Sequence, residues 1–387
     1  MLVGSVDSGD VEVYLDHAAT SPMSKEVVAT YVDAVRATLG NPASGHAAGA
    51  AAKHQLELSR TRAAHAFGVA ADEVLFTSGA TESMNWAVRV AAERPGMIFA
   101  TPIEHSCAME PLKRLGDRVV WLPIAPSGIV DLVPAMEALK ASPKTINALI
   151  VMGANNETGV IQPVRALSSL VKRLNPSAFV ASDLVALAPW GGIAETIEWV
   201  DFGVLSPHKV GGPVGVGVVL LRRRGVEITP LLVGGPQEYD LRAGTVSVPL
   251  AVAGVHALLT AERESERHRQ VCRSLQERLE QGLVALDKRI TIVGSEESRV
   301  GMTSAVFRGL RAEDILFLLD EQGVYASAGA ACASGAMQPS HVLRALGYAR
   351  EEALSQVRFS YAASLDAADI DYALDAVTEV TGKLWRR

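Results

Sequence analysis

The sequence SPHKVGGPVGVG, residues 206–217, places one lysine, Lys209, between a Ser–Pro–His segment and a glycine-rich turn. Apolar segments flank it at residues 200–205 and 216–221, so we expect Lys209 on a tight loop between two buried strands. Burial lowers the pKa of an ammonium group, and the neutral amine can form a Schiff base with a carbonyl cofactor. A surface turn that carries a lysine and a histidine is the other interpretation of this stretch.

Length and composition limit the classes of protein to consider. At 387 residues, the chain is long enough for two domains around a large buried sheet. The net charge of -7 and the scattered basic residues argue against direct nucleic-acid binding. No apolar stretch is long enough to span a bilayer, and residues 1–13 lack the basic start of a secretion signal. The 3 cysteines, in no paired spacing, favour a reducing cytoplasm over a disulfide framework and are too few for a four-thiolate metal site.

Helical and strand patterns alternate along the first two thirds of the chain. This alternation is typical of an α/β fold with a parallel sheet covered by helices on both faces. Ser24 is expected to cap a helix that ends at Gly40, with an apolar face formed by Val27, Val28, Tyr31 and Val35. From about residue 250 to 286 the sequence becomes charged and helix-prone, and the remainder fits a smaller α+β unit.

A phosphate site is predicted at residues 78–82, SGATE, which follow a short strand and open a helix. The free backbone N–H groups and the positive end of the helix dipole attract an anion there. Ala80 and Thr81 begin this helix, and Thr81 adds a hydroxyl donor. An ordinary strand-to-helix turn with a threonine cap explains the same residues.

Two further groups follow predicted strands. Asp183 stands at the end of the strand at residues 179–182, where a parallel sheet presents its functional groups. Its carboxylate could keep a pyridinium nitrogen protonated, or it could cap a helix. His105 follows another strand and could stack on a cofactor ring or move protons, although a lone histidine often has no such role.

Three groups suggest a small carboxylate substrate and a reactive thiol. Asn156, within NNETG at residues 155–159, could bind a carboxylate or only form a turn. Arg358 lies inside an apolar strand, so it needs an anionic partner, either a substrate carboxylate or a structural salt bridge. Cys332 lies among tiny residues, SAGAACASG at 327–335, and we expect an exposed and reactive thiol. Cys107 and Cys272 lie in helical patterns and are expected to be inert.

With these groups assembled, the chain resembles the cysteine desulfurases of the NifS/IscS type, class V aminotransferase relatives within the fold-type I pyridoxal phosphate enzymes. The resemblance runs almost end to end. It includes YLDHAAT at 14–20, GNPAS at 40–44, TSGATES at 77–83, NNE at 155–157, RAGT at 242–245, PSHVL at 339–343 and RFS at 358–360. It implies a large cofactor-binding domain, residues 17–258, and a small domain, residues 1–16 and 259–387, which carries the cysteine loop.

The resemblance also implies how pyridoxal 5'-phosphate is held. Lys209 would form the Schiff base, Asp183 would pair with the ring nitrogen, and His105 would stack on the ring. Asn156 would lie beside both cofactor and substrate. The phosphate contacts would come from Ala80, Thr81, Ser206 and His208, with Thr245 reaching in from the other subunit of a homodimer.

The implied reaction converts L-cysteine to L-alanine. Asn156 and Arg358 would hold the substrate carboxylate, Lys209 would remove the Cα proton, and His105 would manage protons on the substrate thiol. Cys332 would attack the substrate sulfur and keep it as a persulfide for a sulfur-acceptor protein. The implied location is the cytoplasm, with no membrane and no direct nucleic-acid contact.

One position departs from the family. Ala186 stands three residues after Asp183, where the family usually has a glutamine that bonds the phenolate oxygen of the cofactor. Losing this donor should change the absorbance of the cofactor. Two alternatives therefore stay open: a related aminotransferase or selenocysteine lyase that does not need Cys332, and a degenerate, non-catalytic scaffold for sulfur assembly.

Overall fold

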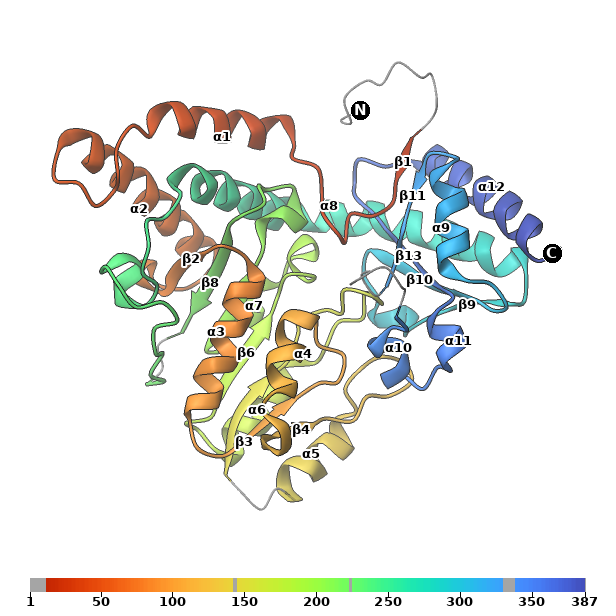
Figure 1. The fold of residues 1–387 in the computed structure, drawn as a ribbon, viewed down its shortest axis with the longest axis horizontal. Helices are drawn as coiled ribbons and strands as arrows, with labels where there is room; N and C mark the ends of the chain where they lie inside the picture. The colour runs from red at the N-terminus through yellow and green to blue at the C-terminus, as the bar shows by residue number, and fades with distance from the viewer. Residues whose placement is uncertain (1–11, 142–144, 223–224, 330–337, 387) are drawn as a thin grey trace.

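A computed structural model describes residues 12–141, 145–222, 225–329 and 338–386. Figure 1 shows a large sheet covered by helices and a smaller unit beside it, joined by one long helix. None of the described helices has the length and apolar character that crossing a membrane requires.

The large sheet has seven strands, and six of them run in the same direction, with β8 reversed. Its order is β2 (Val74–Thr77), β8 (Gly217–Leu221), β7 (Phe202–Leu205), β6 (Phe179–Asp183), β5 (Ile146–Ile150), β3 (Met97–Ala100) and β4 (Val119–Trp121). β8 is antiparallel to both of its neighbours, and the remaining pairs are parallel. Because the carboxyl ends of β3, β5, β6 and β7 meet at one edge, the segments that follow these strands are brought together.

Helices cover both faces of this sheet, as the alternation of patterns predicted. Alternate side chains of each strand enter two apolar cores, with Phe99 in one and Ile98 in the other. The first core includes residues of α2 (Ala47–Phe67) and α6 (Val164–Leu174), and the second includes residues of α3 (Ala80–Glu93) and α4 (Ser106–Lys113). The remaining helices of this part of the chain are α1 (Lys25–Ala37), α5 (Leu132–Ala141) and α7 (Ile193–Ile197).

The smaller unit is built on an antiparallel sheet. Its order is β12 (Ser327–Ala328), β13 (Gln356–Ser360), β10 (Met302–Phe307) and β9 (Ile290–Ile292). The helices around it are α9 (Ala312–Asp320), α10 (His341–Ala345), α11 (Arg350–Ala353) and α12 (Ala367–Leu384). The start of the described chain joins this unit, because β1 (Val13–Tyr14) pairs in parallel with β11 (Val324–Tyr325).

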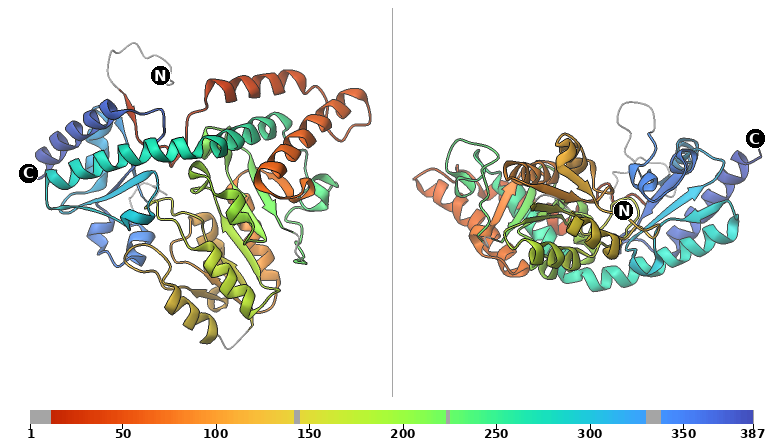
Figure 2. Two further views of the ribbon diagram at one scale, coloured as in Figure 1. Left: turned by 180° about the vertical axis from the view of Figure 1, so that it is seen from behind. Right: turned by 90° about the horizontal axis from the view of Figure 1, so that it is seen from below.

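A single helix, α8 (Val248–Leu286), connects the two units. Leu258 packs in a core of the large sheet, whereas Cys272 packs in the core of the smaller unit. Figure 2 shows α8 running along one side of both units. The boundary expected at residue 258 therefore falls within a continuous helix and stays a prediction.

The apolar face predicted for α1 is only partly buried. Ser24 caps this helix as expected, since its side chain accepts a hydrogen bond from the Val27 backbone N–H. Val27 packs against α8, but Val28 and Val35 are 39% and 46% exposed. The apolar face is therefore present, but in the described chain α8 covers only the part of it around Val27.

Candidate active site

A cavity of about 1890 Å³ lies where the large sheet meets the smaller unit. Nine of the predicted site residues line it, from both units: Ala80, Thr81, His105, Asn156, Asp183, Ser206, His208, Lys209 and Arg358. Thr245 is exposed and is not among the lining residues. Cys332 lies outside the described residues, although Gly329 and Gln338, on either side of the omitted segment, line the same cavity.

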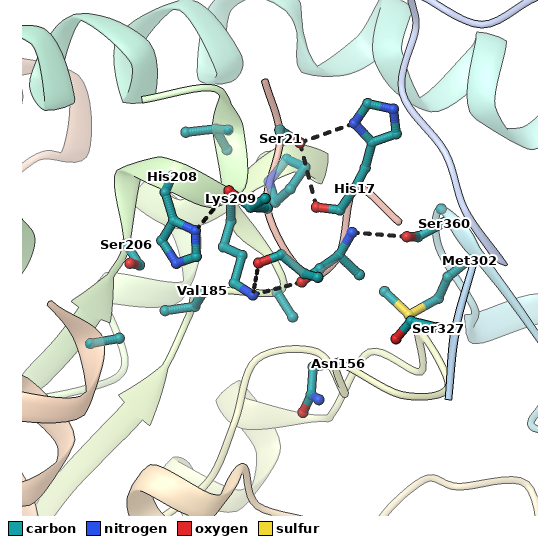
Figure 3. Close-up of a pocket in the computed structure, with 18 of the residues that line it drawn as sticks. His17, Ser21, Asn156, Val185, Ser206, His208, Lys209, Met302, Ser327 and Ser360 are labelled. Carbon is teal, nitrogen blue, oxygen red and sulfur yellow. Dashed lines mark hydrogen bonds between the residues drawn. The ribbon is translucent and has the colours of Figure 1, made fainter. Parts of the chain in front are cut away.

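Lys209 lies on a short turn, η4 (Pro207–Val210), which follows β7 and is ended by Gly211 with a φ of 74°. Its Nζ donates hydrogen bonds to the carbonyl oxygens of Ala18, at 2.6 Å, and Ala19, at 2.8 Å (Figure 3). Burial, aided by the positive charge of Arg358, lowers the pKa of Lys209 to about 8. A neutral amine is therefore accessible near physiological pH, as the sequence led us to expect.

Asp183 ends β6 and is buried at the same edge of the sheet. Its Oδ1 accepts a hydrogen bond from the Val185 backbone N–H at 3.0 Å, and its Oδ2 lies 3.8 Å from the Cys107 Sγ. Burial raises the pKa of Asp183, while the nearby His105 and Lys209 oppose that rise. A cationic group placed against this carboxylate would stabilise its charged form.

His105 is the N-cap residue of α4, which explains why its ring is held still. Its Nδ1 accepts a hydrogen bond from the Cys107 backbone N–H at 3.2 Å, so the ring proton is on Nε2. The ring is open to the cavity, yet partial desolvation lowers the pKa of His105, against the opposing charge of Asp183. The neutral ring can stack on a flat ligand or exchange a proton.

Glu104, which our reading of the sequence did not single out, braces the segment before His105. Its carboxylate accepts hydrogen bonds from the Thr101 hydroxyl, at 2.5 Å, and from the Met152 backbone N–H, at 3.0 Å. Burial raises the pKa of Glu104 to about 8. These contacts tie together the segments that follow β3 and β5, which carry His105 and Asn156.

An anion can be held at the start of α3. Ala80 opens this helix directly after the glycine turn, so its first N–H groups lack partners within the helix. The Gly217 backbone lies so close that a Cβ there would come within 2.5 Å of the Thr77 Oγ1. Only glycine therefore lets β8 approach this turn.

Two more groups face the same region. Ser206 is buried, and His208 shares a hydrogen bond of 3.2 Å between its Nδ1 and the Thr20 Oγ1. Burial lowers the pKa of His208 to about 4, so its ring is neutral at physiological pH and can only hydrogen-bond to an anion. Backbone N–H groups, hydroxyls and a neutral ring suit a phosphate group.

The RAGT motif is fixed next to this turn through an ion pair. Arg242 donates two hydrogen bonds to the Glu82 carboxylate, at 2.8 and 3.1 Å, and Glu82 also accepts one from the Ser78 backbone N–H at 2.8 Å. Thr245, three residues further along the chain, is exposed.

Arg358 crosses the cavity from β13, and its side chain is only 5% exposed. Its Nη2 donates to the Asp16 Oδ1 at 2.8 Å and to the Ser327 Oγ at 3.0 Å, and its Nη1 donates to the Asn156 carbonyl oxygen at 2.8 Å. The structural salt bridge, one of the two alternatives given for the anionic partner of Arg358, is thus present. Asp16 was not predicted as the partner, although it lies within the YLDHAAT motif.

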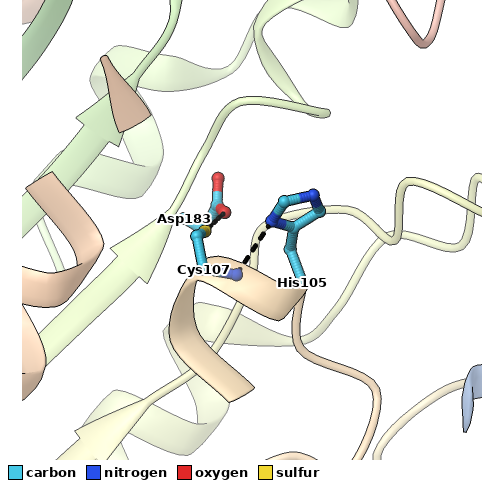
Figure 4. Close-up of side chains that lie close together, drawn as sticks. All are labelled: His105, Cys107 and Asp183. Carbon is cyan, nitrogen blue, oxygen red and sulfur yellow. Dashed lines mark hydrogen bonds between the residues drawn. The ribbon is translucent and has the colours of Figure 1, made fainter. Parts of the chain in front are cut away.

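The two cysteines among the described residues, Cys107 and Cys272, are both buried. Burial raises the pKa of Cys272 to about 12 and also raises the pKa of Cys107. Among the described residues, His105, Cys107 and Asp183 form the one group with a metal-like spacing, their ligand atoms lying within 4.8 Å of one another (Figure 4). The raised pKa keeps Cys107 as a thiol, which is a hydrogen-bond donor rather than a ready metal ligand.

Ala186 lines the cavity but has no side-chain donor. Its methyl group packs against the apolar core beneath the large sheet. The hydrogen bond that a glutamine would make at this position is therefore missing from this chain.

Comparisons with known proteins agree with this geometry. The model of the aminotransferase class-V family matches residues 13–373. The chain is 33% identical to the cysteine desulfurase IscS of Methanosarcina thermophila, over 98% of this chain and 94% of that protein. It is 35% identical to the IscS-like cysteine desulfurase of Mycobacterium tuberculosis, over 94% of this chain and 95% of that protein.

Solved structures give the same result. A NifS-like protein superposes with a TM-score of 0.89 at 32% identity, covering 96% of this chain and 100% of that one. The fold expected from the sequence is thereby confirmed. The match of the family model over most of the chain, together with these near-full-length relatives, shows that the chain belongs to the aminotransferase class-V family.

Proposed function

We propose that the chain is a pyridoxal 5'-phosphate-dependent L-cysteine desulfurase that releases L-alanine and holds the sulfur on Cys332. The observation that carries this proposal is one cavity in which Lys209, Asp183 and the start of α3 meet Arg358 and Asn156. The relatives named as cysteine desulfurases over nearly their whole length support the same activity.

The lining residues fit this cofactor. Lys209 has an amine with a lowered pKa. Asp183 has a buried carboxylate, whose charged form a cationic ring nitrogen would stabilise. The start of α3, with Thr81, Ser206 and His208, would hold the phosphate. When bound, the cofactor supplies an aldehyde for Lys209 and a ring that accepts electrons from the substrate Cα.

The chain's own groups account for the remaining steps. Arg358 and Asn156 orient the substrate carboxylate, and Lys209 takes the proton from Cα. His105, with its neutral ring, accepts the proton of the substrate thiol. The Cys332 thiolate attacks the substrate sulfur, an S–S bond forms and the C–S bond breaks. The carbon skeleton leaves as alanine after it receives one proton at Cβ, from His105, and one at Cα, from Lys209.

A second copy of the chain would complete the site. Val28, Val35 and Leu39, on and just after α1, are each exposed, which suits an apolar contact between subunits. Thr245 is exposed, and in the dimer it would contact the phosphate bound by the other subunit. The product persulfide would pass to a sulfur-acceptor protein, and the proposed location is the cytoplasm.

The decisive experiment is to incubate the protein with L-cysteine, without reductant, and to map its peptides by mass while measuring alanine. We expect one added sulfur, confined to the peptide that holds Cys332, and alanine in the medium. The Lys209→Ala variant should give neither product, and the Cys272→Ser variant should give both.

Two other outcomes would identify the competing functions. Alanine formation at the wild-type rate by Cys332→Ser would favour a lyase-type enzyme that does not use this thiol. No alanine and no bound cofactor would favour the non-catalytic scaffold that Ala186 suggested.

A further inference from the structure

Cys107 touches the carboxylate that ends β6. Its Sγ lies 3.8 Å from the Asp183 Oδ2, and both side chains are buried, at 6% and 5% exposure. The other oxygen of Asp183 accepts the Val185 backbone N–H. Each carboxylate oxygen therefore has one protein donor, and for Oδ2 that donor is the thiol.

The thiol is held in place by the helix that carries it. Cys107 lies in the first turn of α4, and its backbone N–H donates to the His105 Nδ1. Its neighbours Ala108 and Leu112 pack in the core with Ala181 of β6. One helical turn thus holds both the His105 ring and a donor for Asp183, as Figure 4 shows.

A hydrogen bond of this kind matters because the carboxylate is shielded from water. A buried carboxylate that loses a donor also loses part of the stabilisation of its charge. The charges and contacts that act on Asp183 come from several elements: His105, Lys209, Val185 and Cys107, together with the buried carboxyl of Glu104. Val185 contributes only its backbone N–H, and among the three side chains that lower the pKa of Asp183, Cys107 is the one with no role in the proposed reaction.

We propose that Cys107 is a positioning residue, whose S–H group donates to Asp183 and keeps this carboxylate ionised and aimed at the ring nitrogen of the cofactor. This inference rests on the proposed function. A donor on Oδ2 lowers the proton affinity of the carboxylate, so the proton between Asp183 and the ring stays on the ring. A protonated ring withdraws electrons more strongly, and the lysine–cofactor linkage then loses its proton at a lower pH.

The test compares Cys107→Ala and Cys107→Ser with the wild-type holoenzyme. The absorbance of the bound cofactor is recorded against pH, and the dissociation constant of pyridoxal 5'-phosphate is measured for each protein. We expect Cys107→Ala to raise the pH midpoint of the absorbance change by about half a unit and to weaken cofactor binding about two- to fivefold, the range for loss of one weak donor.

The other variants separate the hydrogen bond from packing. Cys107→Ser keeps a donor at this place and should restore the wild-type midpoint. Cys272→Ala removes a buried thiol from the core of the smaller unit and should leave the midpoint unchanged. Thermal unfolding of each variant identifies any protein that does not fold. If Cys107→Ala does not fold, Cys107→Val, which fills the space without a donor, takes its place.

Distinct results overturn the two proposals. An unchanged midpoint in Cys107→Ala, or a shift of equal size in both Cys107 variants, would show that the hydrogen bond has no such role. A wild-type protein that takes up no cofactor, with no borohydride label on Lys209, would instead overturn the proposed function itself.

Discussion

The lowered pKa of Lys209 predicts the pH at which the protein captures its cofactor. Only the neutral amine can attack an aldehyde. A pKa of about 8, against an ordinary 10.5, leaves about one amine in ten neutral at pH 7, instead of about one in three thousand. The structure therefore predicts cofactor capture about 300-fold faster at pH 7 than an ordinary lysine would allow.

The assay mixes cofactor-free protein with pyridoxal 5'-phosphate and follows the absorbance of the Lys209 adduct by stopped flow. The rate constant should rise about tenfold per pH unit from pH 6 to about pH 8, the midpoint, and should then level off up to pH 10. A rate that keeps rising towards pH 10.5 would refute the claim that the cavity desolvates this amine.

Replacement of Arg358 tests the cause of the lowered pKa. Arg358 is the second contributor after burial, and its positive charge disfavours a charged Lys209. Arg358→Gln should move the midpoint to higher pH, because it removes this charge and also releases Asp16, whose negative charge has the opposite effect. Arg358→Lys keeps the charge and should keep the midpoint close to that of the wild type.

Two further substitutions test the frame around the site. Glu238→Gln should lower the free energy of unfolding by about 3–5 kcal/mol in denaturant titrations, because it leaves the buried Arg60 with only the longer, 3.4 Å ion pair to the exposed Glu57. Glu110→Gln, at an exposed ion pair, should cost under about 1 kcal/mol. Gly217→Ala should weaken cofactor binding about tenfold or more in equilibrium titrations, since its Cβ would push the phosphate turn aside. Gly45→Ala has open space around it and should bind the cofactor like the wild type.

Much of the site follows from local sequence patterns. Lys209, Asp183 and the start of α3 each follow an apolar strand, and the carboxyl ends of parallel strands meet at one edge of a sheet. The family motifs then supplied the order of the groups along the chain, and the match to the aminotransferase class-V model confirmed the family. The roles assigned to single residues stay predictions.

Only the tertiary structure identified the partners of the buried charges. Arg358 pairs with Asp16 across 342 positions, Arg60 with Glu238 across 178, and Cys107 meets Asp183 across 76. The spacing of apolar residues along the sequence predicts whether a side chain is buried, because buried positions recur with the period of the helix or strand. Which charge or donor lies opposite depends on how distant elements pack, and the helical pattern of Cys107 therefore predicted an inert thiol where the fold places a donor.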